Sequence, residues 1–140
     1  MGLSTSIAMP ISAFAAEPIV VHRDPGCGCC EQWAVQIRQA FGRPLRIVDN
    51  SRRAALQRQF GLPAALASCH TAIIDGLAFE GHVPIADMKR LLASRPRGVR
   101  GLAVPGMPVG SPGMEVPGAS PQRFNVMAFG AGIPVVYAQH

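Results

Sequence analysis

The 140-residue sequence has few aromatic residues and few charges. Aromatic side chains make up 6% of the chain, with one Trp and one Tyr, so we expect the core to be packed mainly from aliphatic residues. Charged residues make up 15%, and the net charge of +5 comes from arginines scattered along the chain. There is no basic run interleaved with aromatics, which is the usual signature of a nucleic-acid surface, so we expect no nucleic-acid partner.

The sequence also lacks an apolar run of the ~20 residues that a membrane-spanning helix needs, so we expect no membrane span in the mature chain. The uncharged stretch 3–16 contains Ala-Phe-Ala at positions 13–15, a pattern typical of the apolar and cleavage regions of a secretory signal. No Lys or Arg precedes it, which leaves a start codon placed too late, or a buried N-terminal segment, as alternatives. We predict a signal peptide over 1–15, one domain over 16–140, and a periplasmic location.

Hydrophobic periodicity predicts a mixed α/β domain. β-branched runs indicate strands at 18–23 and 45–50, and apolar residues spaced every four positions indicate a helix between them that ends at Gly42. A second helix is expected to end at Gly61, and Asp75-Gly76 between two apolar runs indicates a β-hairpin.

A third helix is expected from Pro84 to the residues before Pro96, with Met88 and Leu91 buried. The resulting order β-α-β-α-β-β-α is the order of a thioredoxin-like domain, a small mixed sheet flanked by helices. After residue 100 the sequence "VPGMPVGSPGMEVPG" predicts a Pro/Gly/Met-rich loop, and "RFNVMAF" with "PVVYAQH" predicts a C-terminal β-hairpin.

Three of the four cysteines lie within four positions in "DPGCGCCEQW", at the start of the first predicted helix. Cys27 and Cys30 have the C-x-x-C spacing of a dithiol switch, and the unpaired N–H groups of a helix start favour a thiolate. Cys29 between them would compete for any mixed disulfide. Three thiolates that converge on one point therefore suit a soft metal better than clean thiol exchange.

The fourth cysteine precedes the third predicted strand. In a thioredoxin-like frame this junction faces the C-x-x-C loop and normally holds a cis-proline, whereas here Cys69 and His70 occupy it. We therefore expect the two cysteine segments to meet, with metal ligands in place of a redox-substrate contact.

The methionines distinguish the candidate metals, because thioether sulfur binds Cu(I) well and zinc poorly. Met107 and Met114 lie in the Pro/Gly-rich loop, which has no periodic face to bury, and flexible packing filler is the alternative explanation for them. His82 is a further candidate ligand, whereas we expect His22 to point outward and His140 to be solvated.

The blocks "DPGCGCCEQW", "LASCHTAIIDG", "EGHVPIADMKRLL" and "GLAVPGMPVGSPGME" resemble, in order, the signature blocks of the CopG-type family, periplasmic proteins encoded with copper-resistance systems. The resemblance spans 20–140. It implies a thioredoxin-like fold whose cysteine cluster binds copper, with the Met-bearing loop and histidines contributing. The ligands implied for this chain are Cys27, Cys29, Cys30, Cys69, His70, His82, Met107 and Met114.

We predict a copper-binding protein that sequesters Cu(I) in copper tolerance, with Cu(I)/Cu(II) cycling as an extension and a polynuclear, thiolate-bridged cluster as the form of the metal. Its expected partners are copper ions and other periplasmic copper-resistance proteins. Three alternatives remain at this point: a thiol–disulfide oxidoreductase that uses Cys27 and Cys30, a structural zinc site, and disulfides 27–30 and 29–69. Metal binding is favoured over enzymatic turnover, which the sequence leaves open.

Overall fold

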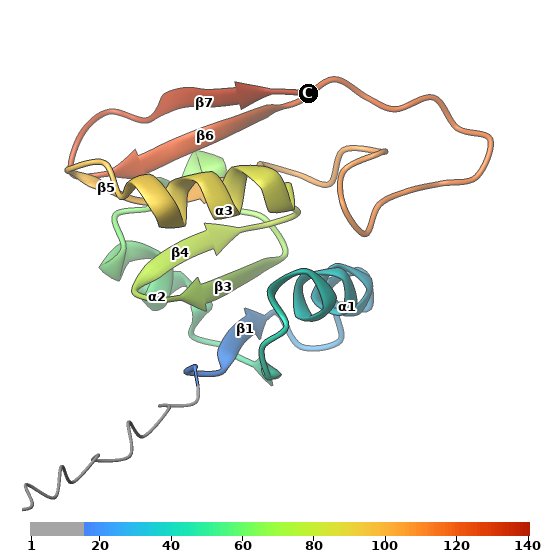
Figure 1. The fold of residues 1–140 in the computed structure, drawn as a ribbon, viewed down its shortest axis with the longest axis horizontal. Helices are drawn as coiled ribbons and strands as arrows, with labels where there is room; N and C mark the ends of the chain where they lie inside the picture. Colours follow the sequence, from blue (N-terminus) through green and yellow to red (C-terminus); the bar gives the residue numbers. More distant parts are fainter. Residues whose placement is uncertain (1–15) are drawn as a thin grey trace, which may run out of the picture.

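The computed structural model describes residues 16–140, so the predicted signal peptide at 1–15 lies outside the described residues. The described chain forms a seven-stranded mixed sheet in the order β2-β1-β3-β4-β5-β6-β7, with helices on both faces (Figure 1). The elements are β1 (Ile19–Arg23), α1 (Cys29–Phe41), β2 (Leu45–Asp49), α2 (Arg53–Gln59), the 3-10 turn η1 (Ala64–Leu66), β3 (His70–Ile74), β4 (Leu77–Glu80), α3 (Ile85–Ser94), β5 (Val99–Ala103), β6 (Asn125–Gly130) and β7 (Val135–Gln139).

The mixed α/β prediction is confirmed, because the chain follows the predicted order β-α-β-α-β-β-α up to the end of α3. β1 pairs in parallel with β2 and antiparallel with β3, and β3 pairs antiparallel with β4. The β3–β4 turn is the predicted one, with Asp75 and Gly76 at φ values of 48° and 80°. Gly42 ends α1 in the left-handed region, as expected, while Pro84 takes the N-cap position of α3 and Ile85 begins the helix.

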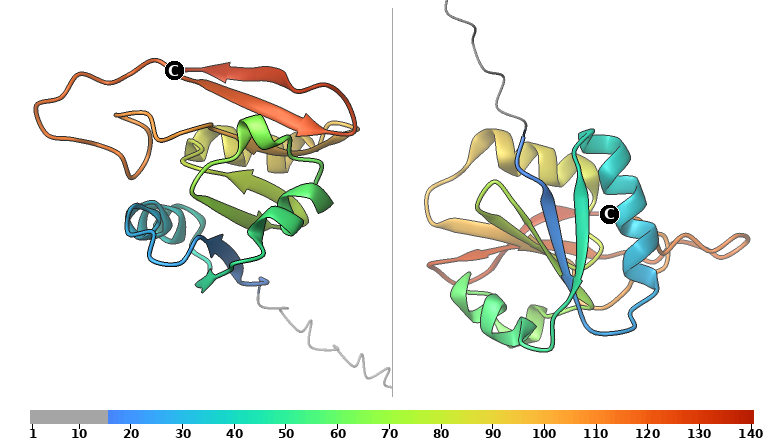
Figure 2. Two further views of the ribbon diagram at one scale, coloured as in Figure 1. Left: turned by 180° about the vertical axis from the view of Figure 1, so that it is seen from behind. Right: turned by 90° about the horizontal axis from the view of Figure 1, so that it is seen from below.

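α1 and α3 cover one face of the sheet and α2 covers the other (Figure 2). On the α1/α3 face, Trp33 and Ile37 of α1 and Met88 and Leu91 of α3 pack against aliphatic residues of the strands. A smaller cluster around Phe129 lies on the α2 face. Most of the core is aliphatic, as the low aromatic content predicted.

Strand β5 was not predicted, and it joins the C-terminal hairpin β6–β7 to the rest of the sheet. The sequence of β5 does not indicate a strand, because glycine is a poor strand former and β5 contains Gly101. The position admits no side chain: a Cβ on Gly101 would lie 1.9 Å from the Ala78 carbonyl oxygen and 2.6 Å from Phe129 Cζ. Glycine here therefore marks a close approach of strands rather than a break between them.

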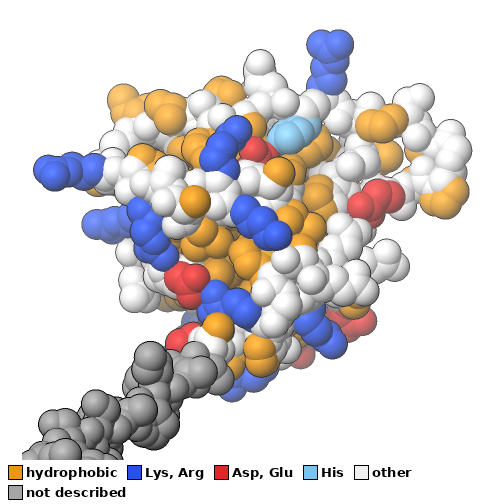
Figure 3. All heavy atoms as spheres, in the orientation of Figure 1, with side chains coloured by type: hydrophobic (Ala, Val, Ile, Leu, Met, Phe, Trp, Pro, Cys, Tyr) orange, Lys and Arg blue, Asp and Glu red, His pale blue; other side chains and the backbone are white. Residues whose placement is uncertain are grey.

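Residues 104–124 form the predicted loop between β5 and β6, which projects beyond the end of the sheet (Figure 1). The loop returns to α1, where a Cβ on Gly113 would lie 2.8 Å from the Trp33 backbone nitrogen. On the face shown in Figure 3, Lys and Arg side chains are dispersed rather than gathered in one patch. No helix among residues 16–140 is both long and apolar enough to cross a membrane.

Candidate metal centre

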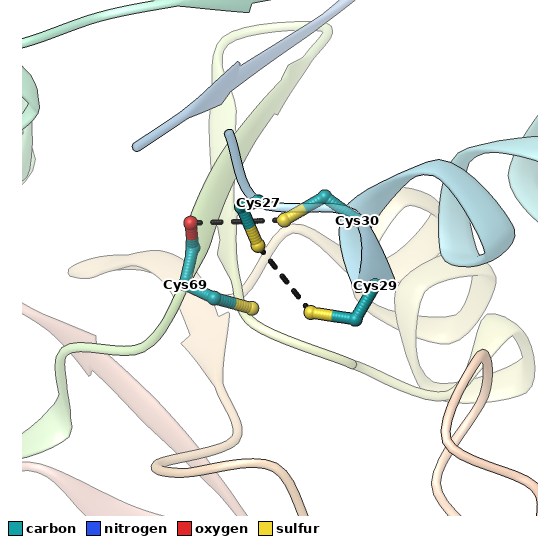
Figure 4. A group of neighbouring side chains, drawn as sticks. All are labelled: Cys27, Cys29, Cys30 and Cys69. Carbon is teal, nitrogen blue, oxygen red and sulfur yellow. Dashed lines mark hydrogen bonds between the residues drawn. The ribbon is translucent and has the colours of Figure 1, made fainter. Parts of the chain in front are cut away.

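The three clustered cysteines lie where the chain leaves β1 and enters α1. Gly28 occupies the N-cap position, and Cys29 and Cys30 are the first two residues of the helix. A hydrogen bond of 3.2 Å from the Cys27 N–H to the Asp24 carbonyl oxygen closes the turn. The Sγ atoms of Cys27 and Cys29 are 3.3 Å apart, and Cys30 is fully buried beside them (Figure 4).

Cys69 directly precedes β3, and its sulfur points toward the cysteine turn (Figure 4). The last residue of β1, Arg23, pairs with the first residue of β3, His70, so the two cysteine segments adjoin at one sheet edge. The Sγ atoms of all four cysteines lie within 4.8 Å of one another. Two sulfurs bound to one ion by metal–sulfur bonds of about 2.3 Å lie at most ~4.6 Å apart, and this limit is close to the 4.8 Å within which all four sulfurs lie. The structure thus brings together the segments that the sequence predicted to meet.

His70 and His82 add ring nitrogens on the Cys69 side of this cluster. His70 Nδ1 lies 3.2 Å and His82 Nε2 lies 3.3 Å from Cys69 Sγ, and both residues are fully buried. His82 Nδ1 donates a hydrogen bond to the Pro112 carbonyl oxygen at 2.7 Å. Nε2 is therefore the nitrogen of His82 that is available to a metal ion. Histidines that bind metals commonly donate their second ring nitrogen in this way. The His70 ring packs at 4.4 Å, between centroids, from the Trp33 ring.

The donor atoms form two groups that overlap at one sulfur. The first contains the four cysteines, and the second contains Cys69 with His70 and His82, each with its donor atoms within 4.8 Å of one another. A thiolate can bridge two metal ions, and Cys69 is the residue placed to do so. Chemically, the site offers soft sulfur ligands together with imidazole, a set suited to copper or zinc.

The close spacing of the cysteines shifts the pKa values of three of their thiols in different directions. A hydrogen bond from Cys30, aided by His70 and His82 and opposed by burial, lowers the pKa of Cys69 far below its usual value. The same contact with Cys69, together with burial, raises the pKa of Cys30, and burial and the bond with Cys27 raise the pKa of Cys29 to about 12. The lowered pKa therefore belongs to Cys69, before β3, whereas the pKa values of Cys29 and Cys30 at the helix start are raised. At Cys29 and Cys30, burial and the neighbouring sulfur atoms raise the pKa by more than the helix N-terminus lowers it.

The two loop methionines differ in position. Met107 Sδ lies 3.5 Å from Cys29 Sγ, and the residue is 48% exposed, at the outer side of the cluster. The hydroxyl of Ser68 donates to the Gly106 carbonyl oxygen at 2.7 Å, which ties the Met107 turn to the residue before Cys69. Met114 is held through its backbone, in hydrogen bonds with loop residues. The structure therefore places the Met107 sulfur against the cysteines and gives Met114 no such contact among the described hydrogen bonds.

Other candidates from the sequence have different partners. His22 Nδ1 lies 3.3 Å from the Asn50 side-chain nitrogen. The His140 side chain is 39% exposed, in line with the expectation of a solvated residue, and its Nε2 lies 2.7 Å from a carboxylate oxygen of the buried Asp87, because β7 carries the C-terminus to α3. All four cysteines are free thiols, so the alternative with disulfides 27–30 and 29–69 is not what the structure shows.

Two buried charged residues on the α2 side of the site were not predicted from the sequence. Arg53 is 6% exposed and Glu80 is fully buried, and they form an ion pair of 2.7 Å. Glu80 ends the otherwise apolar strand β4, a signal of an inward-facing charge that the sequence did contain. Its partner is 27 residues away, so sequence pattern does not reveal it.

Two solved structures titled "Copper resistance protein copG" resemble this chain. Form 1 is 39% identical with a TM-score of 0.78, over 89% of this chain and 98% of that chain. Form 2 is 40% identical with a TM-score of 0.76, over 88% and 97%. A family model described as "Protein of unknown function, DUF411" matches residues 66–114. None of the curated proteins matches. The likeness to the two structures thus extends over most of the described chain.

Proposed function

This chain belongs to the CopG-type family of copper-resistance proteins, and on that premise we propose that it is a periplasmic protein that sequesters Cu(I) in copper tolerance. The relatives' titles and the Cys/His cluster support a copper-related role. The observation that carries the proposal is the meeting of four cysteine sulfurs and two imidazoles at one edge of the sheet.

Met107 favours copper over a structural zinc ion. Its thioether lies 3.5 Å from Cys29 Sγ, and thioethers are good ligands for Cu(I) and poor ones for zinc. A structural zinc site is closed by four ligands, so one zinc ion would leave the remaining sulfur and nitrogen donors without a role. Copper accounts for the larger set.

We propose a polynuclear, thiolate-bridged cluster, because the two donor groups share Cys69. One ion among the cysteines and a second between Cys69, His70 and His82 would use the same thiolate. The mixed sulfur and imidazole set also supports Cu(I)/Cu(II) cycling as an extension of the proposal, since imidazole is a good ligand for Cu(II).

The metal-free site holds protons that copper must displace. Burial lowers the pKa of His82, but hydrogen bonds with Cys69 and the Pro112 carbonyl outweigh it, so the pKa is raised. Cys29 and Cys30, with raised pKa values, keep their thiol protons at neutral pH. Copper binding should therefore release protons.

We also infer that the domain over 16–140 is thioredoxin-like. The neighbours β2-β1-β3-β4, with α1 directly after β1, support this assignment. The periplasmic location is supported by the uncharged stretch 3–16 and by the family's association with copper resistance.

The test is an anaerobic Cu(I) titration of reduced protein against a chromogenic chelator. The wild type should bind more than one Cu(I) per chain, and the triple variant Cys27→Ser, Cys29→Ser, Cys30→Ser should lose most of this binding. His140→Ala, which alters a histidine paired with Asp87, is the control and should bind as the wild type does. A ratio that never exceeds one overturns the polynuclear cluster, and failure to compete with the chelator overturns Cu(I) sequestration.

A further inference from the structure

Arg53, at the start of α2, uses every donor of its guanidinium group. Nε and Nη2 donate to the two carboxylate oxygens of Asp24 at 3.0 and 2.9 Å, and Nη2 donates again to the Ser68 carbonyl oxygen at 2.6 Å. Nη1 donates to Glu80 Oε1 at 2.7 Å and to Thr71 Oγ1 at 3.2 Å. These five bonds match the five N–H groups of arginine, so its orientation is fully determined.

Glu80 is the second centre of the same network. Its Oε1 accepts from Arg53, from the Gln57 side-chain amide at 2.8 Å and from the Ser68 backbone N–H at 2.7 Å. Its Oε2 accepts from the Thr71 hydroxyl. Both carboxylate oxygens are satisfied although the residue is fully buried, as a retained buried charge requires.

Apart from Gln57 of α2, the partners of this pair adjoin the proposed ligands in the sequence. They are Asp24 before Cys27, Ser68 and Thr71 on either side of the Cys69–His70 pair, and Glu80 itself before His82. Two of the bonds go to the main-chain N–H and carbonyl of Ser68, so they set the backbone position just before Cys69. The Ser68 hydroxyl holds the Met107 turn through Gly106. The network thus touches every ligand-bearing segment.

Stability alone is a weak explanation for such a pair. Burying two charges carries a large desolvation penalty, and apolar residues of similar volume often stabilise a fold as well or better. What apolar residues lack is direction, and here the directed bonds end on three segments that are far apart in sequence. Those segments lie at strand ends and in a turn, where the sheet alone does not set the spacing of side chains.

We propose that Arg53 and Glu80 are positioning residues that hold the ligand-bearing segments at the spacing copper requires. Neither residue belongs to the two donor groups, so both act through the ligands they hold. The inference rests on the proposed copper binding, and it adds the part of the fold that preorganises the site. Groups behind metal ligands typically change metal affinity by 10–100-fold when they are replaced.

The experiment compares Arg53→Lys and Glu80→Gln with Arg43→Lys. Lysine keeps the charge of Arg53 but, as a single ammonium group, cannot reach all the network partners at once. Arg43 is the matched control, because its guanidinium binds the carboxylate of Asp75 at the opposite end of the β3–β4 hairpin. For each protein, folding is verified by circular dichroism, and Cu(I) affinity is measured by chelator competition at a temperature where the metal-free protein is folded. The emission of the Cu(I)–thiolate centre is the second readout.

We expect Arg53→Lys and Glu80→Gln to bind Cu(I) about 10–100-fold more weakly, with altered emission, and Arg43→Lys to bind within about twofold of the wild type. Folded variants with wild-type affinity and emission would overturn the inference. If Arg53→Lys does not fold, Asp24→Asn replaces it, because that side chain is 59% exposed, and wild-type binding by this variant overturns the inference equally. A wild type that binds no Cu(I) would instead overturn the proposed function, and the inference with it.

Discussion

The β3–β4 hairpin is held by an arginine–carboxylate pair at each end, and the two pairs differ in burial. At the turn end, Arg43 donates to both oxygens of Asp75 at 2.9 and 3.0 Å, and the Asp75 side chain is 45% exposed. At the open end, the side chains of Arg53 and Glu80 are 7% and 0% exposed. An exposed pair contributes at most about 1 kcal/mol, whereas breaking a buried one leaves an uncompensated charge.

The two ends also differ in what surrounds the pair. Within residues 16–140, the groups able to hold a soft metal lie at the open end, around Cys69. The same two strands build both ends, so the backbone alone does not explain the difference. An arginine–carboxylate pair thus lies beside a turn where it is exposed and beside the proposed metal ligands where it is buried.

The largest effect should come from breaking the buried pair. Arg53→Met should destabilise the protein by about 3–5 kcal/mol, because Glu80 is left charged and unpaired in the core. Arg43→Met should lose less than about 1 kcal/mol. Urea unfolding followed by circular dichroism measures both. Equal losses would mean that burial does not distinguish the two ends.

Cys69→Ser should have the next largest effect, in copper affinity rather than in stability. Cys69 belongs to both donor groups, so its loss should weaken Cu(I) binding by more than about 100-fold, beyond the range seen for groups behind the ligands. Asp75→Asn at the turn end should leave affinity unchanged. Chelator competition on both variants tests this, and a loss of less than tenfold for Cys69→Ser would contradict a bridging role.

Acidification should weaken copper binding at the open end. The pKa of Cys29 is raised to about 12 and that of Cys30 is raised as well, so both thiols are protonated at neutral pH and copper must displace their protons. Affinity should therefore rise with pH, by about tenfold per unit for each proton displaced. Competition titrations at several pH values measure the slope, which should fall in Cys29→Ser. A flat profile would argue against thiol ligation.

The smallest effect should separate the two loop methionines. Met107→Leu should weaken Cu(I) binding by roughly threefold to tenfold, with no effect on zinc, because only Cu(I) favours thioether sulfur. Met114→Leu should change Cu(I) affinity less, since among the described hydrogen bonds it is the Met107 sulfur that lies against a cysteine sulfur, at 3.5 Å from Cys29 Sγ. Leucine conserves volume, so packing should be little affected. The reverse ranking of the two variants would mean that the loop rearranges when copper binds.

The oxidoreductase alternative can be tested on the same proteins. It requires Cys27 and Cys30 to exchange disulfides, so insulin reduction should depend on Cys30 and be indifferent to Cys29. We expect little reduction at all, because Cys30 is buried, has a raised pKa and lies among three other sulfurs. Reduction at a thioredoxin-like rate that is lost in Cys30→Ser and kept in Cys29→Ser would favour the alternative.

Much of the fold and of the cysteine cluster was predictable from local pattern. Strand and helix periodicity, the Asp75-Gly76 turn and Gly42 at the end of α1 each depend on a few neighbouring residues. Strand β5 was missed because a glycine such as Gly101 usually indicates a break in a strand. Glycine is needed at this position because Ala78 and Phe129, which belong to other strands, approach it closely. The pairing of His140 with Asp87 was also missed, because the two residues are 53 positions apart in the sequence.

The sequence by itself determined which donors the protein carries, because the C-x-C-C spacing is a local signal. The order of the predicted elements, that of a thioredoxin-like domain, also indicated that the two cysteine segments meet. Only the tertiary structure decided that the pKa of Cys69 is lowered, that the Met107 sulfur lies against Cys29, and that one arginine links the ligand-bearing segments. Those outcomes depend on burial, on distances between groups far apart in the chain and on the desolvation of charge. They exist only once the chain has folded.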